Sequence, residues 1–285
     1  MGDMKIISSV SELEIFLNKT SKNKSLGFVP TMGALHQGHL SLVKKAIAQN
    51  ELSLCSIFVN PTQFNNTNDL DNYPNQLDSD LKLLEEIGCD VVFTPNKTEV
   101  YPEGLGSRSY DFGTLDKVME GVNRPGHFEG VAMVVSRLFE IIQPKRAYFG
   151  ERDFQQLAII RSLAAQSFKN IEVVPCPILR EPDGLAMSSR NMLLDEKHRA
   201  AAPRIYQILL SIQKQVKTKT VPELKQWGVQ EFSSDKHLKL EYLEISDSVS
   251  LTKTLQWSDY QTHICCVAVL AGSVRLIDNI LLEIN

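Results

Sequence analysis

The chain has 285 residues, of which 43% are hydrophobic and 22% charged, a composition that is ordinary for a soluble globular protein of one large domain or two. The formal net charge of −4 provides no basic surplus, which argues against a general nucleic-acid binder. The apolar runs, such as 264–271, are too short to span a bilayer and the first ten residues lack a signal-peptide pattern, so we expect no membrane partner.

The cysteines favour a reducing compartment. They are odd in number and form no Cys-x-x-Cys pattern: Cys55, Cys89, Cys176, Cys265 and Cys266. Structural thiols explain this better than a disulfide framework or a zinc site, so we expect a cytoplasmic protein. If Cys265 and Cys266 lie on a strand, they point to opposite faces.

Strand-like and helix-like segments alternate through the first part of the chain. Short apolar runs predict strands at 26–29, before Pro30, and at 53–59, 90–93, 147–149 and 171–174. Apolar residues at helical spacing predict helices at 39–49, 77–87, 130–142 and 154–168. This alternation predicts an α/β fold with a Rossmann-like, doubly wound parallel sheet, whose sites lie at the carboxyl ends of the strands.

The pattern changes after residue 178. A long helical region is expected at 195–216 and a second helix at 221–230, followed by strands at 240–245, 263–270 and, weakly, 274–280. We therefore predict a larger domain over 1–178 and a smaller C-terminal α+β domain over 179–285.

A histidine pair follows the first of these strands, in the segment PTMGALHQGH at 30–39. Gly33 and Gly38 permit close approach of a ligand to the backbone, and a helix beginning near His39 offers free N–H groups and a positive dipole end to phosphate. His36 and His39 can then donate hydrogen bonds to charge that grows as pyrophosphate leaves. A random His-x-x-His is more often a pair of surface or core residues, and no third metal ligand is evident by spacing, so we assign no metal residue.

Two further segments contain polar groups suited to phosphate. In MSSRN at 187–191, hydroxyls and an Arg fork match polyphosphate oxygens, although such a segment alone is usually a plain polar loop. In FGERDFQQL at 149–157 a strand meets a helix. There Asp153 either engages ribose hydroxyls or caps the helix that begins at Phe154.

These segments together resemble one family. The His-x-Gly-His segment is similar to the HIGH signature of nucleotidyltransferases and class I aminoacyl-tRNA synthetases. The segments FVNPTQF at 58–64, RPGHFEG at 124–130, FGERDFQQL at 149–157 and DGLAMSSRN at 183–191 resemble the pantothenate synthetase family, in the right order, over about 27–191. Arg124 and His127 of the second segment either support the site or belong to a turn built by Pro125 and Gly126.

The resemblance implies a reaction. ATP and (R)-pantoate give a pantoyl adenylate and pyrophosphate; the amine of β-alanine then attacks, giving AMP and pantothenate, the coenzyme A precursor. Mg²⁺ is implied as the counter-ion of ATP, which it binds mainly through phosphates. The resemblance further implies that 179–285 closes over the ATP site and that the chain forms a homodimer through its N-terminal domain.

The resemblance also implies roles for individual residues. His39 is implied as the catalytic acid, with His36 beside it; Gln63 is implied to bind pantoate and β-alanine, and Gln156 to bind pantoate. ATP-binding residues are implied at Met32, Gly33, Ala34, Leu35, His36, Gln37, Gly38, His39, Gly150, Glu151, Arg152, Asp153, Leu179, Met187, Ser188, Ser189 and Arg190. Arg152 departs from the family's usual Lys, and because the Arg fork is larger and geometrically stricter, we expect an altered phosphate contact and slower adenylation.

Three alternatives remain open. The polar segment 65–73 beside Gln63 is either a lid that excludes water or a plain surface loop. A nucleotidyltransferase that keeps the nucleotide on its product is the nearest rival activity. A nucleotide-binding module without turnover is the other, although it would not need both histidines and both glutamines.

Overall fold

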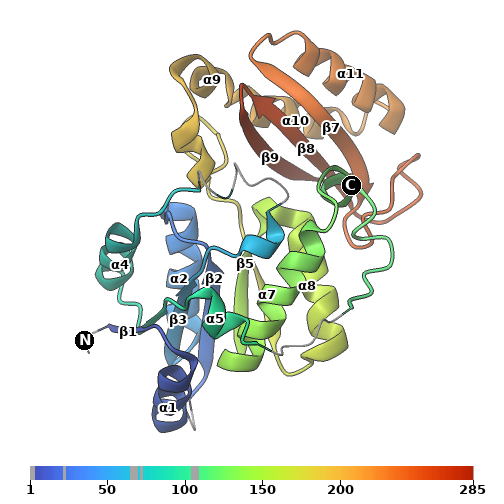
Figure 1. Cartoon of the computed structure of the whole chain (residues 1–285). Helices are drawn as coiled ribbons and strands as arrows, with labels where there is room; N and C mark the ends of the chain where they lie inside the picture. The colour runs from blue at the N-terminus through green and yellow to red at the C-terminus, as the bar shows by residue number, and fades with distance from the viewer. Residues whose placement is uncertain (1–3, 22–23, 65–69, 71–72, 104–108, 285) are drawn as a thin grey trace.

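The computed structural model describes residues 4–21, 24–64, 70, 73–103 and 109–284. It contains a six-stranded sheet with the strand order β1-β4-β3-β2-β5-β6 and a separate three-stranded sheet with the order β7-β8-β9. The six-stranded sheet and its helices form the lower part in Figure 1, and the three-stranded sheet with α10 and α11 forms the upper part. The α/β fold with a smaller C-terminal α+β part is confirmed.

All strands of the larger sheet are parallel. They are β1 (Lys5–Ile7), β2 (Leu26–Thr31), β3 (Leu52–Ile57), β4 (Val91–Phe93), β5 (Arg146–Gly150) and β6 (Glu172–Cys176). From β2 the chain proceeds through β3 and β4 on one side and returns to β5 on the other. The strand order therefore reverses between β2 and β5, and in such sheets ligands bind at that switch point, beyond the carboxyl ends of the strands.

Pro30 marks where β2 and β5 part. β2 pairs with β5 only at Gly27 and Phe28, but it pairs with β3 along its whole length. Proline has no N–H to donate to a neighbouring strand, which disfavours it in a central strand. Beyond Phe28, however, β2 is paired only with β3. The prediction that the strand ends before Pro30 was wrong, because β2 continues along β3 to Thr31. The separation of β2 from β5 opens the sheet at its switch point.

Helices cover both faces of this sheet. They are α1 (Val10–Thr20), α2 (Gln37–Gln49), α4 (Leu77–Glu86), α5 (Lys97–Val100), α6 (Met119–Asn123), α7 (His127–Ile142) and α8 (Phe154–Ser167), with short 3₁₀ turns η1 (Pro61–Gln63) and η2 (Glu151–Asp153). Successive strand residues enter opposite cores: Phe28 packs with residues of α1, α7 and α8, whereas Val29 packs with residues of α2 and α4. This alternation in a continuously apolar strand is typical of a sheet buried on both faces.

The C-terminal part packs helices on one face of an antiparallel sheet. It contains η3 (Ser189–Leu193), α9 (Glu196–Ala201), α10 (Arg204–Gln215), α11 (Val221–Ser233), β7 (Leu238–Asp247), β8 (His263–Ala271) and β9 (Val274–Leu282). The single helix expected at 195–216 is two helices, because Pro203 cannot donate a helical hydrogen bond and occupies the N-cap of α10. The last strand, expected to be weak, is nine residues long.

The two adjacent cysteines of β8 show how the sheet is shared. Cys265 packs into the core beneath α10 and α11, whereas Cys266 packs with Met119 and Leu251 at the boundary with the larger sheet. The expectation that they face opposite ways is confirmed. One face of the small sheet therefore forms its own core with α10 and α11, and the other face packs against the part of the chain that contains the larger sheet.

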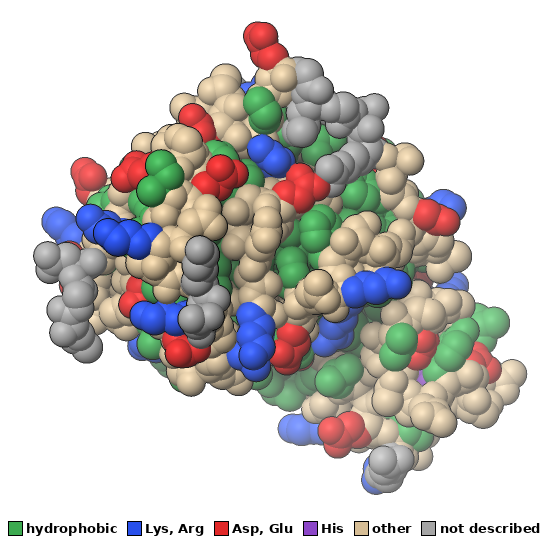
Figure 2. Space-filling view, turned by 90° about the horizontal axis from the view of Figure 1, so that it is seen from below, with side chains coloured by type: hydrophobic (Ala, Val, Ile, Leu, Met, Phe, Trp, Pro, Cys, Tyr) green, Lys and Arg blue, Asp and Glu red, His purple; other side chains and the backbone are tan. Residues whose placement is uncertain are grey.

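The outer surface carries both signs of charge. On the lower face, Lys and Arg side chains are interspersed with Asp and Glu (Figure 2). None of the helices in the described ranges has the length and apolar character needed to cross a membrane.

Candidate active site

The loop that leads into the histidine pair is held by a buried aspartate. Gly33 and Ala34 adopt positive φ angles of 84° and 50°. Asp80 of α4 lies behind them, 1% exposed, and its two carboxylate oxygens accept hydrogen bonds from the amides of Ala34 and Leu35 at 2.8 and 2.7 Å. The strained backbone of Ala34 is thus fixed by charge-assisted hydrogen bonds. The motifs do not identify Asp80; the only sequence signal is an acid between the apolar Leu77, Leu81 and Leu84.

His36 and Gly38 together start the helix. Helix α2 begins at Gln37, two residues earlier than expected, and His36 is its N-cap, with Nδ1 accepting from the amide of Gly38 at 3.1 Å. A Cβ on Gly38 would lie 2.7 Å from His36 Cε1, so the glycine is needed to make room for the imidazole. His-x-Gly-His is therefore a helix-capping arrangement in its own right.

The hydrogen bonds fix the tautomers of both histidines. Because His36 Nδ1 accepts from Gly38, its Nε2 bears the proton. The amide of His36 donates to Nδ1 of His39 at 3.4 Å, so the Nε2 of His39 bears its proton too. The ring centroids are 4.1 Å apart, which places two N–H donors side by side at the start of α2.

Both imidazoles are neutral at neutral pH. Burial, followed by the nearby charge of Arg152, lowers the pKa of His36 from 6.5 to about 4. Burial, followed by His36 and Arg152, holds the pKa of His39 well below its usual value. In this state the pair offers hydrogen bonds, and no positive charge, to its surroundings.

Arg152 joins the two loops that were expected to hold phosphate. Its Nη1 donates to the carbonyl of Met187 at 2.9 Å, and its Nη2 and Nε donate to Oδ2 of Asp153 at 2.9 and 3.2 Å. Asp153 is the N-cap residue of α8, but its side chain makes no capping hydrogen bond. The helix-cap alternative for the Asp153 side chain was therefore wrong, and its carboxylate is instead paired with Arg152.

The side chain of Gln63 is oriented by Asn60, the N-cap of η1, and by Met32, which follows β2. Its Oε1 accepts from Asn60 Nδ2 at 3.3 Å, and its Nε2 donates to the sulfur of Met32 at 3.1 Å. The main-chain carbonyl of Gln63 is in turn hydrogen bonded to Nδ1 of His127 at 3.0 Å. The turn expected at Pro125 and Gly126 is present, with Gly126 in a left-handed conformation before α7, and His127 contacts the backbone of Gln63.

Two adjoining cavities bring the predicted residues together. One is lined by Met32, Gln63, Tyr73, Arg124, His127, Ser189 and Arg190. The other is lined by Gly38, Gly150, Leu179 and Met187. Both contain His36, His39, Arg152, Asp153 and Gln156 in their walls, so these five residues lie where the cavities meet. The junction lies beyond the carboxyl ends of β2 and β5.

Six of the residues expected to bind ATP are not part of either wall: Gly33, Ala34, Leu35, Gln37, Glu151 and Ser188. Ala34 and Leu35 are held by Asp80, and the hydroxyl of Ser188 caps η3 by accepting from the amide of Arg190 at 3.2 Å. The suspected lid at 65–73 lies outside the described residues except for Leu70 and Tyr73. Within the described ranges, no group of three or more His, Cys, Asp or Glu side chains could hold a metal ion.

A doubly wound sheet with two N–H-bearing imidazoles at a helix start above its switch point defines a Rossmann-like nucleotide-binding enzyme. The chain belongs to the pantoate–β-alanine ligase family, whose model matches residues 5–281. It is 48% identical to the pantothenate synthetase of Phocaeicola vulgatus over 279 residues, which cover 97% of this chain and 99% of the relative. It is 47% identical to that of Cytophaga hutchinsonii, with 97% and 98% covered.

Solved structures of the same family have the same fold as this chain. The pantothenate synthetase of Thermus thermophilus superposes with a TM-score of 0.91 at 41% identity, covering 97% of this chain and 99% of that one. The pantoate–β-alanine ligase of Francisella tularensis, solved as a complex with beta-gamma ATP and β-alanine, superposes with a TM-score of 0.81 at 38% identity, covering 98% and 97%. The predicted family and its ligase activity in pantothenate biosynthesis are confirmed.

Proposed function

We propose that this chain joins pantoate to β-alanine at the junction of the two cavities, by way of a pantoyl adenylate. The observation behind the proposal is that His36, His39, Arg152, Asp153 and Gln156 line both cavities. A nucleotide in the cavity with Gly150, Leu179 and Met187 and an acid in the cavity with Gln63 would meet at these residues. The complex of the Francisella tularensis relative with beta-gamma ATP and β-alanine supports the same ligands here.

In the first step a carboxylate oxygen of pantoate attacks the α-phosphorus of ATP, and the bond to pyrophosphate breaks. Gln63 and Gln156 hold pantoate with amides, which both donate and accept hydrogen bonds and leave the nucleophile its charge. His36 and His39 each direct an Nε2–H toward the phosphates, and Arg152, Ser189 and Arg190 add further donors. Orientation of the attacking oxygen is the main contribution of such a site.

In the second step the amine of β-alanine attacks the acyl carbon of the adenylate. The carbon–oxygen bond to AMP breaks, the amine loses a proton, and pantothenate is formed. Gln63 borders the place where the amine must approach, which supports its dual role toward pantoate and β-alanine. Apolar walls from Val131, Val134 and Leu138 limit water near the reactive ester.

Several wider features belong to the same proposal. Mg²⁺ enters as part of the ATP substrate and is held mainly by phosphate oxygens and water. We place the domain boundary at 178/179, because the residues after it include the Met187 loop and the small sheet. A homodimer formed through the larger domain and a cytoplasmic location complete the proposal; the latter is supported by five free, buried cysteine thiols.

The test is a product assay. The protein is mixed with ATP, Mg²⁺, pantoate and β-alanine, and pantothenate and AMP are expected in equal amounts. Without β-alanine, only pantoate-dependent exchange of pyrophosphate into ATP is expected. Formation of ADP, or of a stable nucleotide adduct of pantoate that β-alanine does not consume, would refute the proposal.

A further inference from the structure

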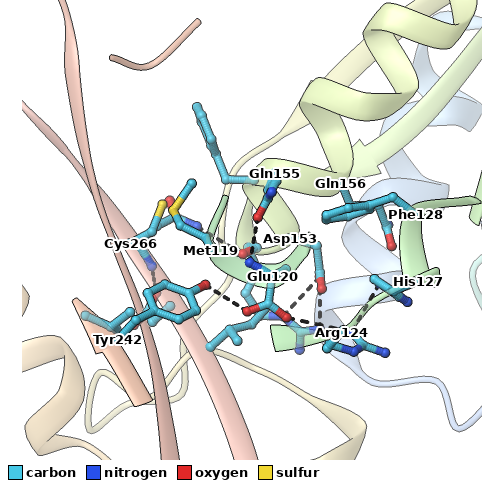
Figure 3. Close-up of a pocket in the computed structure, with 16 residues that line it drawn as sticks. Met119, Glu120, Arg124, His127, Phe128, Asp153, Gln155, Gln156, Tyr242 and Cys266 are labelled. Carbon is cyan, nitrogen blue, oxygen red and sulfur yellow. Dashed lines mark hydrogen bonds and ion pairs between the residues drawn. The ribbon is translucent and has the colours of Figure 1, made fainter. Parts of the chain in front are cut away.

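Glu120 is a buried carboxylate at the boundary between the two sheets. It is 6% exposed, and Figure 3 shows it between Tyr242 of β7 and Arg124. Arg275 of β9 donates two hydrogen bonds to it, Nη1 to Oε2 at 2.7 Å and Nη2 to Oε1 at 2.8 Å, and the hydroxyl of Tyr242 donates to Oε1 at 2.8 Å. Burial alone would raise the pKa of Glu120, but the hydrogen bonds and charge of Arg275 bring it below its usual value. Glu120 and Arg275 therefore form an ionised, bidentate pair.

The turn that holds Glu120 is rigidly specified. Met119, buried beside it, has a φ of 42°, a left-handed conformation that is strained in a residue other than glycine. The amide of Glu120 donates to Oε1 of Gln155 at 3.0 Å. The amide group of Gln155 donates to the carbonyls of Leu115 and Val118 at 2.6 and 2.9 Å. Such a strained, fully bonded turn fixes where the carboxylate points.

From Glu120 a chain of contacts leads into the larger cavity. Arg124, four residues on, is 3.7 Å from the carboxylate, and its Nη1 is 3.1 Å from Nε2 of His127. Arginine can only donate, so Nε2 of His127 accepts, and Nδ1 must carry the proton that it gives to the Gln63 carbonyl. The two hydrogen bonds of His127 on this path therefore each have one direction.

We propose that Glu120 and Arg275 are positioning residues for the pantoate pocket: through Arg124 and His127 they couple the placement of the C-terminal sheet to Gln63. The inference rests on the proposed role of Gln63 in binding pantoate. Neither Arg275 nor Glu120 lines that cavity, so their effect on it is indirect.

A second contact from the same strand leads elsewhere. Asn279, four residues after Arg275 on β9, donates from Nδ2 to the carbonyls of Glu151 and Arg152 at 2.8 and 3.0 Å. Those carbonyls belong to η2, beside the cavity that we assign to ATP. The strand therefore contacts the larger cavity's supports through Arg275 and the η2 backbone through Asn279, and the two contacts can be separated by mutation.

The experiment compares steady-state kinetics of Arg275→Met and Asn279→Ala, with Arg204→Met as the control. Arg204 is paired with Glu231 at 2.9 Å inside the C-terminal part and lines neither cavity. We expect Arg275→Met to raise the KM for pantoate about tenfold and to change the KM for ATP less than about twofold, because small misplacements of binding groups are costly. Asn279→Ala should show the reverse preference, and Arg204→Met neither.

Arg275→Lys keeps the charge but not the two-pronged geometry, so it should show a smaller rise in the same KM even if Arg275→Met folds poorly. Equal rises in both KM values for Arg275→Met and Arg275→Lys would indicate general loosening and overturn the inference. So would an unchanged KM for pantoate in a folded Arg275→Met protein. Failure of the proposed function is distinguishable, because then the wild-type protein itself would form no pantothenate.

Discussion

Replacing Asp80 with Asn tests how the histidine loop is held. The carboxylate accepts two backbone hydrogen bonds, from Ala34 and Leu35, at a position that is 1% exposed. An Asn side chain has one acceptor oxygen, so its NH₂ group would face the second amide and leave a buried N–H without a partner. An unsatisfied buried donor costs about 1–3 kcal/mol. Burial raises the pKa of Asp80, opposed by those two hydrogen bonds, so part of this loss is offset because a neutral side chain is easier to bury.

The expected effect is a free energy of unfolding lower by about 2 kcal/mol, equivalent to a fall in Tm of roughly 4–8 °C for a domain of this size. Because Gly33 and Ala34 rely on these hydrogen bonds for their positive φ angles, the KM for ATP should rise as well. Thermal unfolding and initial rates measure the two effects. Asp78→Asn, an exposed change on the same helix, is the matched control. If both variants have the same Tm and the same KM for ATP, Asp80 does not hold the loop.

Three further predictions follow from the site. His39→Ala should retain the fold but slow pantoate-dependent adenylation by about 10²–10³-fold, as measured by pyrophosphate exchange; near-normal exchange would remove His39 from the mechanism. Arg152→Lys should raise kcat/KM for ATP about fivefold, because a lysine gives up the roughly 1 kcal/mol partly exposed pairing with Asp153 and Met187 and is freer to reach phosphate; unchanged kinetics would show that this departure from the family is neutral. His36 and His127 have pKa values lowered to about 4, so below pH 6.5 the unfolded chain binds protons that the native chain does not, and stability should fall as pH drops from 6.5 toward 4; a denaturant midpoint at pH 5 equal to or above that at pH 7 would contradict this.

The sequence was most informative where a pattern extends over several residues. Apolar runs and helical spacing predicted the five strands of the larger sheet after β1 and the three strands of the smaller one, because burial on both faces of a sheet requires continuous apolar residues. The short strand at Lys5–Ile7 was not predicted, since three residues offer too little pattern, and helix α1 was not predicted either. The break at Pro203 was also missed, although proline alone could have revealed it.

Site residues were predictable only when they belong to a contiguous motif. His36, Gln63, Arg152 and Gln156 lie in such motifs, and the fold brings them together. Asp80 and Glu120 do not lie in such motifs. Asp80 binds residues that are 45 and 46 positions away in the sequence, and Glu120 is bound by a residue that is 155 positions away. Hydrogen-bond partners at such separations depend on packing, which single-sequence patterns do not contain.

The neutral state of the histidine pair in the free chain has a consequence for the acid role that we propose for His39. In the free chain, burial and the positive charge of Arg152 lower the pKa of His36 to about 4, and burial together with His36 keeps the pKa of His39 low as well. Bound triphosphate places several negative charges beside the same rings, and opposite charge favours the protonated form. We therefore expect bound ATP to raise both pKa values. In the proposed mechanism this would make the His39 acid available as pyrophosphate leaves, in a site whose imidazoles are neutral before the nucleotide binds.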